Sequence, residues 1–433
     1  MKLIVHRGTK EVGGSCVELI SCQTRIIIDM GLPLVDKKGE PFDSNVLKGK
    51  VIEDLIGEKI LPDVKGLYSN GDRGIAAIFL SHSHQDHYGL LRYIHPDIPV
   101  YMSQGAKILI EISDLFIPVK VNLPNIITLK GWQPIEIGDF VVKPYLVDHS
   151  APDARAFLVK SKSTGERLFY SGDFRGHGRK KVVLDNLISH PIKHVDCLVM
   201  EGTTLGRDDK EYASEEAVEA RMAEIFRLKE NIAFVFCSSQ NIDRLVSIYR
   251  AAKRTQQTLV IDLYTAYILD SLKVISNNLP QYWWEDIKVI YFHHHAEVLA
   301  NNELKDFLYR CKSAKIEREE VNRDKKNIVM VAKYNYDFRR LLGYPDDLAG
   351  AVAVYSMWEG YLERSNLREI LKQKGIELES VHTSGHATER DLKRFEEAIK
   401  PKCLVPIHTF RPQEYMALFH NVHMLNDGEE LVI

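Results

Sequence analysis

The sequence predicts an α/β protein. Short apolar runs separated by turn residues predict buried strands, and Ile26-Ile27-Ile28 and Ala76-Ala77-Ile78-Phe79-Leu80 are two examples. From about residue 206, apolar runs alternate with segments that predict helices. Alternation of strand and helix at this spacing is typical of parallel strands covered by helices.

The same signals place the other elements along the chain. The sequence Ser214-Glu215-Glu216-Ala217 predicts the start of a helix that runs to about Lys229. Further helices are predicted after Asn241, over 264–272 and over 388–399. Further strands are predicted over 3–5, 140–142, 167–170, 197–200, 233–236, 258–261 and 403–407.

Two changes of pattern predict the domain boundaries. The character of the chain changes at about residue 206 and again at about 366, which divides it into residues 1–205, 206–365 and 366–433. The charge-rich stretch 317–326 is expected to be a solvated helix face or a loop. A chain of 433 residues is long enough for this organisation.

The composition is that of a soluble globular protein, with 45% hydrophobic and 27% charged residues. No apolar run reaches the roughly 18 residues that cross a bilayer, and the N-terminus is too short in its apolar part for a signal peptide. We therefore expect a cytoplasmic protein with no membrane partner. The six cysteines form no C-x-x-C pair, so neither a thiolate zinc site nor a disulfide framework is expected.

The net charge of −3 does not by itself favour a nucleic-acid partner, because such proteins are often basic. Bound divalent cations would add positive charge where a phosphate must lie. Local clusters of charge also matter more than the total. The net charge therefore does not exclude a phosphodiester substrate.

The strongest local signal is Ser81-His82-Ser83-His84-Gln85-Asp86-His87, which follows a predicted strand. Three imidazoles and one carboxylate lie within six residues, and zinc accepts both kinds of ligand. In an extended turn, His82 and His84 can reach one metal ion while Asp86 and His87 face another. The alternative is a histidine-rich surface turn, and the position after a buried strand argues against it.

Three more segments place metal-competent side chains just after predicted strands. His149 follows the apolar segment 140–147, Asp173 follows the strand 167–170, and His408 follows the strand 403–407. Sites in α/β proteins gather at the carboxyl ends of strands. Each residue alone has a structural interpretation, but the cluster at 82–87 favours two complete metal shells.

In this order, these residues resemble the motifs of the metallo-β-lactamase superfamily. Asp29 follows a predicted strand, and the H-x-H-x-D-H sequence at 82–87, His149 and Asp173 follow it as the successive motifs of that superfamily do. The resemblance implies a four-layer αββα sandwich.

The rest of the chain resembles one branch of the superfamily, the β-CASP nucleases, which include ribonuclease J and the cleavage subunit of the polyadenylation machinery. Glu201 in Glu201-Gly202-Thr203 is similar to motif A of that branch, His386 to motif B and His408 to motif C. The resemblance covers nearly the whole chain. It implies that residues 206–365 are an α/β β-CASP domain inserted into a metallo-β-lactamase domain formed by residues 1–205 and 366–433, and that RNA runs in the cleft between the two domains.

The resemblance implies two Zn²⁺ ions, with Mn²⁺ as another metal that such ligands accept. The first ion would be held by His82, His84 and His149. The second ion would be held by Asp86, His87 and His408. Asp173 would bridge the two ions.

The implied reaction is cleavage of RNA phosphodiester bonds, by endonuclease action, 5′-exonuclease action or both. Two metals roughly 3.5–4 Å apart share a water, and the resulting hydroxide attacks phosphorus. His386 would protonate the leaving 3′-oxygen, Glu201 would orient that imidazole, and Asp29 would orient the histidine-bearing loop. The candidate catalytic residues are Asp86, Glu201, His386 and Asp29.

Five residues are candidate phosphate ligands. Ser238, Ser239 and Asn241 precede a predicted helix, where backbone N–H groups hold phosphates. The segment resembles the place where ribonuclease J receives a 5′-phosphate, alongside His382 and Ser384. An ordinary helix N-cap is the alternative.

Two further segments are candidates for contact with RNA. Arg175 begins Arg175-Gly176-His177-Gly178-Arg179-Lys180-Lys181, which carries four positive charges directly after Asp173 and suits a polyanion. A solvated basic loop is the alternative. The segment 355–361 is expected near the cleft, where the inserted domain returns to the main one, and a substrate contact there stays open.

Two other functions share some of these features. A hydrolase of thioesters or lactams shares the metal motifs, but a small substrate needs no inserted domain. A non-catalytic RNA-binding relative is expected to lose metal ligands, and all seven are present. RNA is expected rather than DNA because His408 stands where DNA-directed relatives carry valine.

The chain extends twenty-five residues past His408, so the additional C-terminal domain of ribonuclease J is expected to be absent. The expected partners are RNA and, as an assembly, a second copy of the chain in a homodimer.

Overall fold

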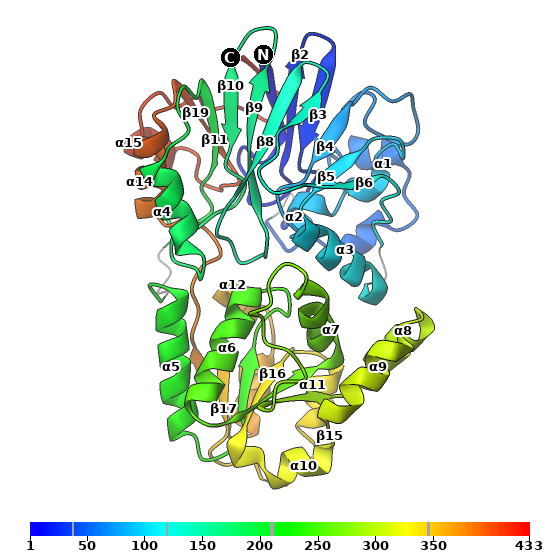
Figure 1. Ribbon diagram of the computed structural model, residues 1–433, viewed down its shortest axis with the longest axis vertical. Coiled ribbons are helices and arrows are strands. Elements are labelled where there is room, and N and C mark those ends of the chain that lie inside the picture. Colours follow the sequence, from blue (N-terminus) through cyan, green and yellow to red (C-terminus); the bar gives the residue numbers. More distant parts are fainter. Residues whose placement is uncertain (37–38, 118–119, 208–211, 344–346) are drawn as a thin grey trace.

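The computed structural model describes residues 1–36, 39–117, 120–207, 212–343 and 347–433. Figure 1 shows two halves, of which the upper one holds both termini and the lower one holds the middle of the chain. Two sheets lie in the upper half and one in the lower half.

The first sheet is mixed and has seven strands, six of them from the first 128 residues. In spatial order its strands are β20 (Glu430–Val432), β1 (Lys2–Arg7), β2 (Cys16–Ser21), β3 (Thr24–Ile28), β4 (Ala77–Phe79), β5 (Val100–Met102) and β6 (Ile126–Thr128). The strands from β1 to β3 are antiparallel, and those from β3 to β6 are parallel.

The second sheet has six strands and completes the upper half. In spatial order its strands are β19 (Cys403–Ile407), β11 (Cys197–Glu201), β10 (Arg167–Tyr170), β9 (Arg155–Ser161), β8 (Phe140–Leu146) and β7 (Ile135–Ile137). The strands β10, β11 and β19 run parallel to one another, so their carboxyl ends meet at one edge.

Alternating burial explains why these runs are apolar throughout. Side chains of a strand point alternately to the two faces of its sheet. Ile26 and Ile28 pack between the two sheets, whereas Ile27 packs under the helices on the outer face. In the second sheet Tyr170 faces the first sheet and Phe169 faces outward, again under helices. The four-layer αββα sandwich is therefore confirmed.

Helices cover both outer faces of the sandwich. The first sheet is covered by α1 (Ile52–Gly57), α2 (Gln85–Tyr88) and α3 (Gln104–Phe116). The second sheet is covered by α4 (Lys181–Ser189), α14 (Glu389–Ile399) and α15 (Glu414–Leu418). Short 3-10 turns lie at Ser44–Leu47 and Leu91–Tyr93.

The third sheet is parallel throughout and lies in the lower half. In spatial order its strands are β15 (Lys315–Ile316), β14 (Ile287–Ile290), β13 (Thr258–Asp262), β16 (Ile328–Ala332), β12 (Ala233–Phe236), β17 (Val352–Tyr355) and β18 (Glu377–Ser380). Ala233 and Val235 face one core, and Phe234 and Phe236 face a second core on the other side. The predicted layer of parallel strands between helices is confirmed.

Helices connect the strands of the third sheet. They are α5 (Glu215–Leu228), α6 (Ile242–Arg254), α7 (Leu263–Leu272), α8 (His293–Asn301), α9 (Lys305–Cys311), α10 (Arg318–Arg323), α11 (Tyr336–Leu341), α12 (Glu359–Glu363) and α13 (Leu367–Gln373), with 3-10 turns at Lys312–Ala314 and Lys325–Asn327. Ser214 caps α5 by accepting from the backbone N–H of Ala217, as its sequence predicts.

One helix of the upper half joins the cores of both halves. Ala106 and Ile110 of α3 pack in the core under the first sheet. Ile108, Leu109 and Ile112 lie on the opposite side and pack in a core of the third sheet. In Figure 1, α3 accordingly lies where the two halves meet.

The third sheet extends beyond residue 365, where the sequence places the end of the inserted domain. The strand β18 pairs in parallel with β17, so Glu377–Ser380 lies with the inserted part. The sequence signal missed this strand because it has one partner and is only half-buried. The division into domains stays a proposal, and this pairing favours a second boundary near 380.

Among the described residues, no helix has the length and apolar composition that a bilayer crossing requires.

Replacement of Leu109 by alanine tests the contact between the halves. Leu109 is fully buried, so we expect Leu109→Ala to lower the free energy of unfolding by roughly 2–5 kcal/mol. Glu111→Ala, on the exposed face of the same helix, is the control and should change it by less than about 0.5 kcal/mol. Urea unfolding measures both, and equal effects of the two variants would contradict the assignment.

Candidate metal centre

The candidate ligands lie just after strands of both sheets. His82 and His84 follow β4, and the first turn of α2 carries Asp86 and His87. The second sheet supplies three more ligands after its strands: His149 after β8, Asp173 after β10 and His408 after β19. The structure therefore brings together all seven residues in two adjoining groups.

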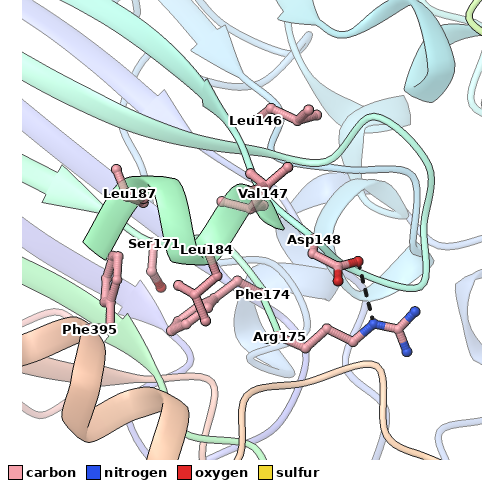
Figure 2. Close-up of a pocket in the computed structure, with 10 residues that line it drawn as sticks. Leu146, Val147, Asp148, Ser171, Phe174, Arg175, Leu184, Leu187 and Phe395 are labelled. Carbon is pink, nitrogen blue, oxygen red and sulfur yellow. Dashed lines mark ion pairs between the residues drawn. The ribbon is translucent and has the colours of Figure 1, made fainter. Parts of the chain in front are cut away.

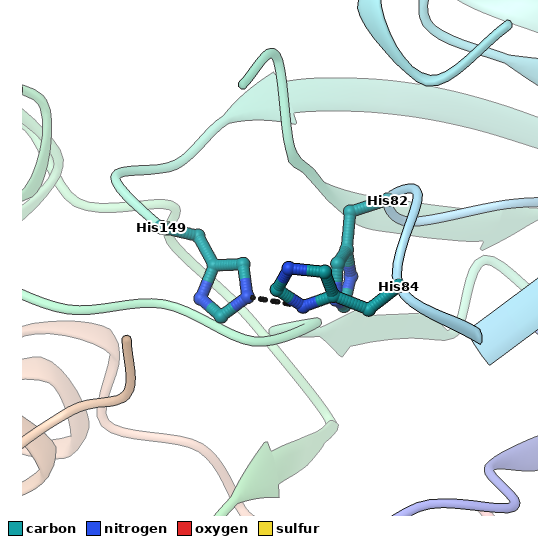
Figure 3. A group of neighbouring side chains, drawn as sticks. All are labelled: His82, His84 and His149. Atoms are coloured by element: carbon teal, nitrogen blue, oxygen red, sulfur yellow. Dashed lines mark hydrogen bonds between the residues drawn. The ribbon is translucent and has the colours of Figure 1, made fainter. Parts of the chain in front are cut away.

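The first group consists of His82, His84 and His149, whose rings face one another in Figure 3. His84 Nδ1 lies 3.1 Å from His82 Nε2 and 3.1 Å from His149 Nε2. His149 Nδ1 lies 2.5 Å from the carbonyl oxygen of Gly385, which fixes the orientation of the ring.

The second group consists of Asp86, His87, Asp173 and His408. His87 Nε2 lies 3.1 Å from Asp173 Oδ2, and His408 Nε2 lies 3.1 Å from Asp86 Oδ2. The same Asp173 oxygen lies 3.8 Å from His82 Nε2 in the first group. Asp173 is therefore placed between the two groups.

Both groups fit a divalent metal ion. Ligand nitrogens about 2.0–2.1 Å from a tetrahedral zinc lie roughly 3.3 Å apart, which is close to the 3.1 Å between the imidazole nitrogens. Burial and the neighbouring imidazoles hold the pKa of His82 well below its usual range, and burial lowers the pKa of His84 to about 4. Neutral imidazole is the form that binds a metal.

The carboxylates of the second group are also in the form that binds a metal. Burial opposes ionisation of Asp86, but His87 and His408 outweigh it and hold the pKa of Asp86 below its usual range. The ligands of both groups are thus imidazole nitrogens and carboxylate oxygens, which suit zinc and manganese.

Asp29 supports the histidine-bearing loop, as the resemblance implies. It accepts hydrogen bonds from the backbone N–H of Ser81 (2.7 Å), the Ser81 hydroxyl (2.8 Å) and the Tyr170 hydroxyl (2.8 Å). Its Oδ2 also lies 2.8 Å from Nδ1 of His87, so it orients a candidate ligand directly. Asp29 has φ of +61°, and such backbone strain in a non-glycine residue is held by surrounding contacts.

The backbone beside Asp29 fits closely against the same loop. Met30 donates its N–H to the carbonyl of His87 (2.7 Å), and Leu32 donates to that of Gln85 (2.9 Å). A Cβ on Gly31 would lie 1.6 Å from the carbonyl oxygen of Asp86. Only glycine allows this approach, so residue 31 helps to fix the position of the metal ligands.

His386 and Glu201 lie beside the two groups. His386 Nδ1 is 3.4 Å from Glu201 Oε1 and 3.6 Å from Asp173 Oδ2. Burial opposes protonation of His386, but the carboxylates of Glu201 and Asp173 outweigh it and raise its pKa. Glu201 is itself fixed by backbone N–H groups of Thr203 (3.0 Å) and Ala387 (3.1 Å).

The prediction that Arg175 contacts RNA is wrong. Its side chain is fully buried and lies 2.6 Å from Asp243, 3.4 Å from Glu215 and 3.6 Å from Asp148. Figure 2 shows it beside Asp148. The guanidinium also donates to the carbonyl oxygen of Ser384 (2.8 Å). Its charge is thus neutralised inside the protein.

The rest of the predicted basic loop is also paired. Arg179 binds Glu219, and Lys180 lies 3.3 Å from Asp243. Lys181 is exposed and lies 3.4 Å from Glu216. Neither a polyanion site nor a solvated loop therefore describes this segment, because carboxylates of α5 and α6 face it.

The segment before α6 has mainly a structural role. Asn241 caps α6 by accepting from the N–H of Arg244 (3.1 Å), and the buried Ser239 hydroxyl lies 2.7 Å from the Thr265 hydroxyl. The N-cap interpretation is confirmed for Asn241, and only the Ser238 side chain is exposed.

Arg244 connects this segment with the segment that carries His382 and Ser384. Arg244 lies 3.2 Å from His382 Nδ1 and donates to the carbonyl oxygen of Thr383 (3.2 Å). Burial and the charge of Arg244 lower the pKa of His382 to about 3. Ser384 accepts from the backbone N–H of His386 (3.2 Å).

Sequence reasoning missed the buried ion network around Arg244. Glu215 lies 2.9 Å from Arg244 and also faces Arg175, and both arginines are fully buried. The position of Glu215 next to a helix N-cap gave only a capping signal. No local pattern shows that a charged side chain lies in the interior.

Comparisons with family models indicate a metallo-hydrolase of the β-lactamase superfamily. Residues 62–232 match the β-lactamase superfamily domain, and residues 375–413 match the Zn-dependent metallo-hydrolase RNA specificity domain. These two segments contain all seven candidate ligands, together with Glu201 and His386. The family models and the ligand groups together support a metal cofactor.

Within this superfamily, the chain is similar to ribonuclease J proteins. Ribonuclease J of Sinorhizobium meliloti is 24% identical over 364 residues, which cover 81% of this chain and 60% of that protein. Ribonuclease J of Helicobacter pylori (strain B128) is 22% identical over 424 residues, which cover 94% and 56%. The resemblance to the ribonuclease J group of the β-CASP branch is confirmed, and the chain spans only 56–60% of the length of these relatives.

A solved structure shares the fold over the full chain. It is a protein of unknown function from Enterococcus faecalis V583, with a TM-score of 0.78 and 22% identity. The match covers 100% of this chain and 99% of that one.

Removal of metal tests the two ligand groups. We expect a chelator to lower the thermal unfolding midpoint and added Zn²⁺ to restore it, because a ligand at 100 times its Kd adds about 2.7 kcal/mol of stability. His84→Ala should weaken the response to Zn²⁺, whereas His294→Ala, an exposed histidine of α8, should keep it. An unchanged response in His84→Ala would contradict the assignment of His84.

Replacement of Arg175 tests the structural role of its buried ion pairs. Arg175→Gln leaves buried carboxylates without their partner, so the free energy of unfolding should fall by roughly 3–5 kcal/mol. Lys181→Gln, in the exposed part of the same loop, should change it by less than about 0.5 kcal/mol. Urea unfolding distinguishes them, and a stable Arg175→Gln variant would argue against a structural role.

Proposed function

We propose that the protein is a two-zinc ribonuclease that hydrolyses phosphodiester bonds of RNA. The observation that carries the proposal is the position of His386 and Glu201 beside both ligand groups. Two metal groups alone suit many hydrolases, whereas an added acid fits a reaction with a poor leaving group. The similarity to ribonuclease J proteins supports RNA as the substrate.

Each side chain has one role in this proposal. The first zinc would be held by His82, His84 and His149, and the second by Asp86, His87 and His408. Asp173 would be shared by the two sites, and Mn²⁺ is the other ion that the ligands accept. When bound, the two ions supply Lewis acidity and lower the pKa of a water molecule.

His386 provides the proton for the leaving group. Its Nδ1 faces Glu201 and Asp173, so Nε2 is the nitrogen left to donate to the ribose 3′-oxygen. The carboxylate of Glu201 stabilises the imidazolium before this transfer, consistent with the raised pKa of His386. Asp29 holds the orientation of His87.

Replacement of His386 separates its role from metal binding. His386→Ala should reduce kcat by roughly 10²–10⁴-fold because the leaving oxygen loses its acid. Its zinc content, measured by atomic emission, should match that of the unaltered protein, whereas His84→Ala should contain less zinc. A loss of zinc in His386→Ala equal to that in His84→Ala would sink the acid assignment.

The substrate is tested with one RNA labelled at both ends. It is offered with a 5′-monophosphate and with a 5′-hydroxyl, beside the matching DNA, and His84→Ala is the control. Release of mononucleotides from the phosphorylated RNA identifies a 5′-exonuclease, and internal fragments from both RNAs identify an endonuclease. No metal-dependent cleavage of any strand would overturn the proposed function.

A cytoplasmic location and a homodimer stay predictions from the sequence. Light scattering of the purified protein measures its mass in solution and so tests for the homodimer.

A further inference from the structure

An aromatic and basic cluster lies beside the metal centre, and no role described above uses it. It consists of Trp358 and Tyr361 at α12 of the inserted part and of Arg207 and Arg364. Trp358 is the N-cap of α12, and its ring meets that of Tyr361 edge-on at a centroid distance of 5.3 Å. In Figure 1, α12 lies at the end of the lower half that faces the sandwich.

Hydrogen bonds place the segment of Arg207 next to the candidate catalytic residues. The N–H of Arg207 donates to the carbonyl oxygen of Thr204 (3.1 Å), and the Thr204 hydroxyl donates to the carbonyl oxygen of Ala387, the residue after His386 (2.5 Å). The hydroxyl of Thr203 lies 2.9 Å from Nδ1 of the candidate ligand His408. The segment that carries Arg207 therefore adjoins both a candidate metal ligand and the candidate acid.

The Trp358 ring is held in place from several sides. The guanidinium carbons of Arg207 and Arg364 lie 5.8 and 5.7 Å from its centroid, which are cation–π distances. A Cβ on Gly360 would lie 2.3 Å from the ring, so glycine is needed for the ring to lie against the helix backbone. The tryptophan thus connects α12 with Arg207, which lies in the segment between β11 and α5.

Parts of the cluster are accessible to a ligand. The side chain of Tyr361 is 54% exposed although it lies beside buried residues. Within the described ranges of the chain, the guanidinium groups of Arg207 and Arg364 meet the Trp358 ring and form no ion pair with a carboxylate. Arg411, which follows the candidate ligand His408 closely, lies against Gly206 and adds a third guanidinium. An exposed aromatic ring among such arginines matches the chemistry of a single-stranded nucleic acid.

We propose that the Tyr361 ring, supported edge-on by Trp358, is a stacking platform for an unpaired base of the RNA next to the scissile phosphate, and that Arg207 and Arg364 hold the phosphates that flank this base. The proposal rests on the proposed function and specifies how that site takes its substrate. A base must leave a duplex to stack on a protein ring, so single-stranded RNA is the expected form.

Steady-state cleavage of a short single-stranded RNA by the zinc-loaded full chain tests the platform. Tyr361→Ala should lower kcat/KM about 5- to 100-fold, mainly through KM, because stacking contributes to binding of each base. Tyr361→Phe keeps the ring and should stay within about threefold of the unaltered protein. Tyr309→Ala, an exposed tyrosine of α9, is the matched control and should have no effect.

Abasic RNA separates stacking from a structural role. A set of RNAs carries an abasic residue at each position around the cleavage site in turn. At one position the kcat/KM of the unaltered protein should fall by the same factor that Tyr361→Ala loses on intact RNA. On that abasic RNA the unaltered protein and Tyr361→Ala should have equal kcat/KM. A Tyr361→Ala defect that persists on every abasic RNA, or no defect at all, overturns the platform while leaving the ribonuclease proposal intact. Failure of the unaltered protein to cleave any RNA overturns both.

Discussion

Seven imidazole and carboxylate groups from four segments of the chain meet in two adjoining groups, and this convergence constrains the structure around it. Imidazole rings whose nitrogens lie 3.1 Å apart repel one another when they are protonated, so the arrangement is stable only if the rings stay neutral or share a cation. The protein places them there through strand ends of two sheets, and it uses strained backbone at Asp29 and His408 to aim the side chains. The αββα sandwich is what brings those strand ends to one edge, so the layer order of the fold is a requirement of the site.

A buried ion network links the metal centre to the inserted part. Arg175 follows Asp173 by two residues and binds carboxylates of both α5 and α6. It also donates to Ser384, whose segment carries His386 and the carbonyl that orients His149. Buried ion pairs are costly to break from one side. The network therefore fixes the loop of the candidate acid relative to the metal ligands, while α3 joins the apolar cores of the two halves.

The candidate metal ligands could be found from the sequence because their signal is local and repeated. The spacing within 82–87 is itself a ligand pattern, and each remaining ligand follows an apolar run. The role expected for Arg175 failed for the opposite reason. Its sequence neighbours are basic, but its partners Glu215 and Asp243 are 40 and 68 residues away. Ser239 and Asn241 likewise have a typical phosphate-binding position, and the structure shows their side chains engaged with Thr265 and the α6 backbone.

The sequence by itself determined the class of fold, the strands with the clearest apolar runs, several helices and the residue types of the candidate metal centre. These follow from hydrophobic periodicity and from side-chain chemistry at fixed spacing, both of which are short-range properties. Only the tertiary structure decided which charges are buried, that β18 pairs with β17 beyond residue 365 and that Arg207 meets the Trp358 ring. These depend on contacts between segments far apart in the chain, and burial changes the energy of a charge in a way that no local pattern records.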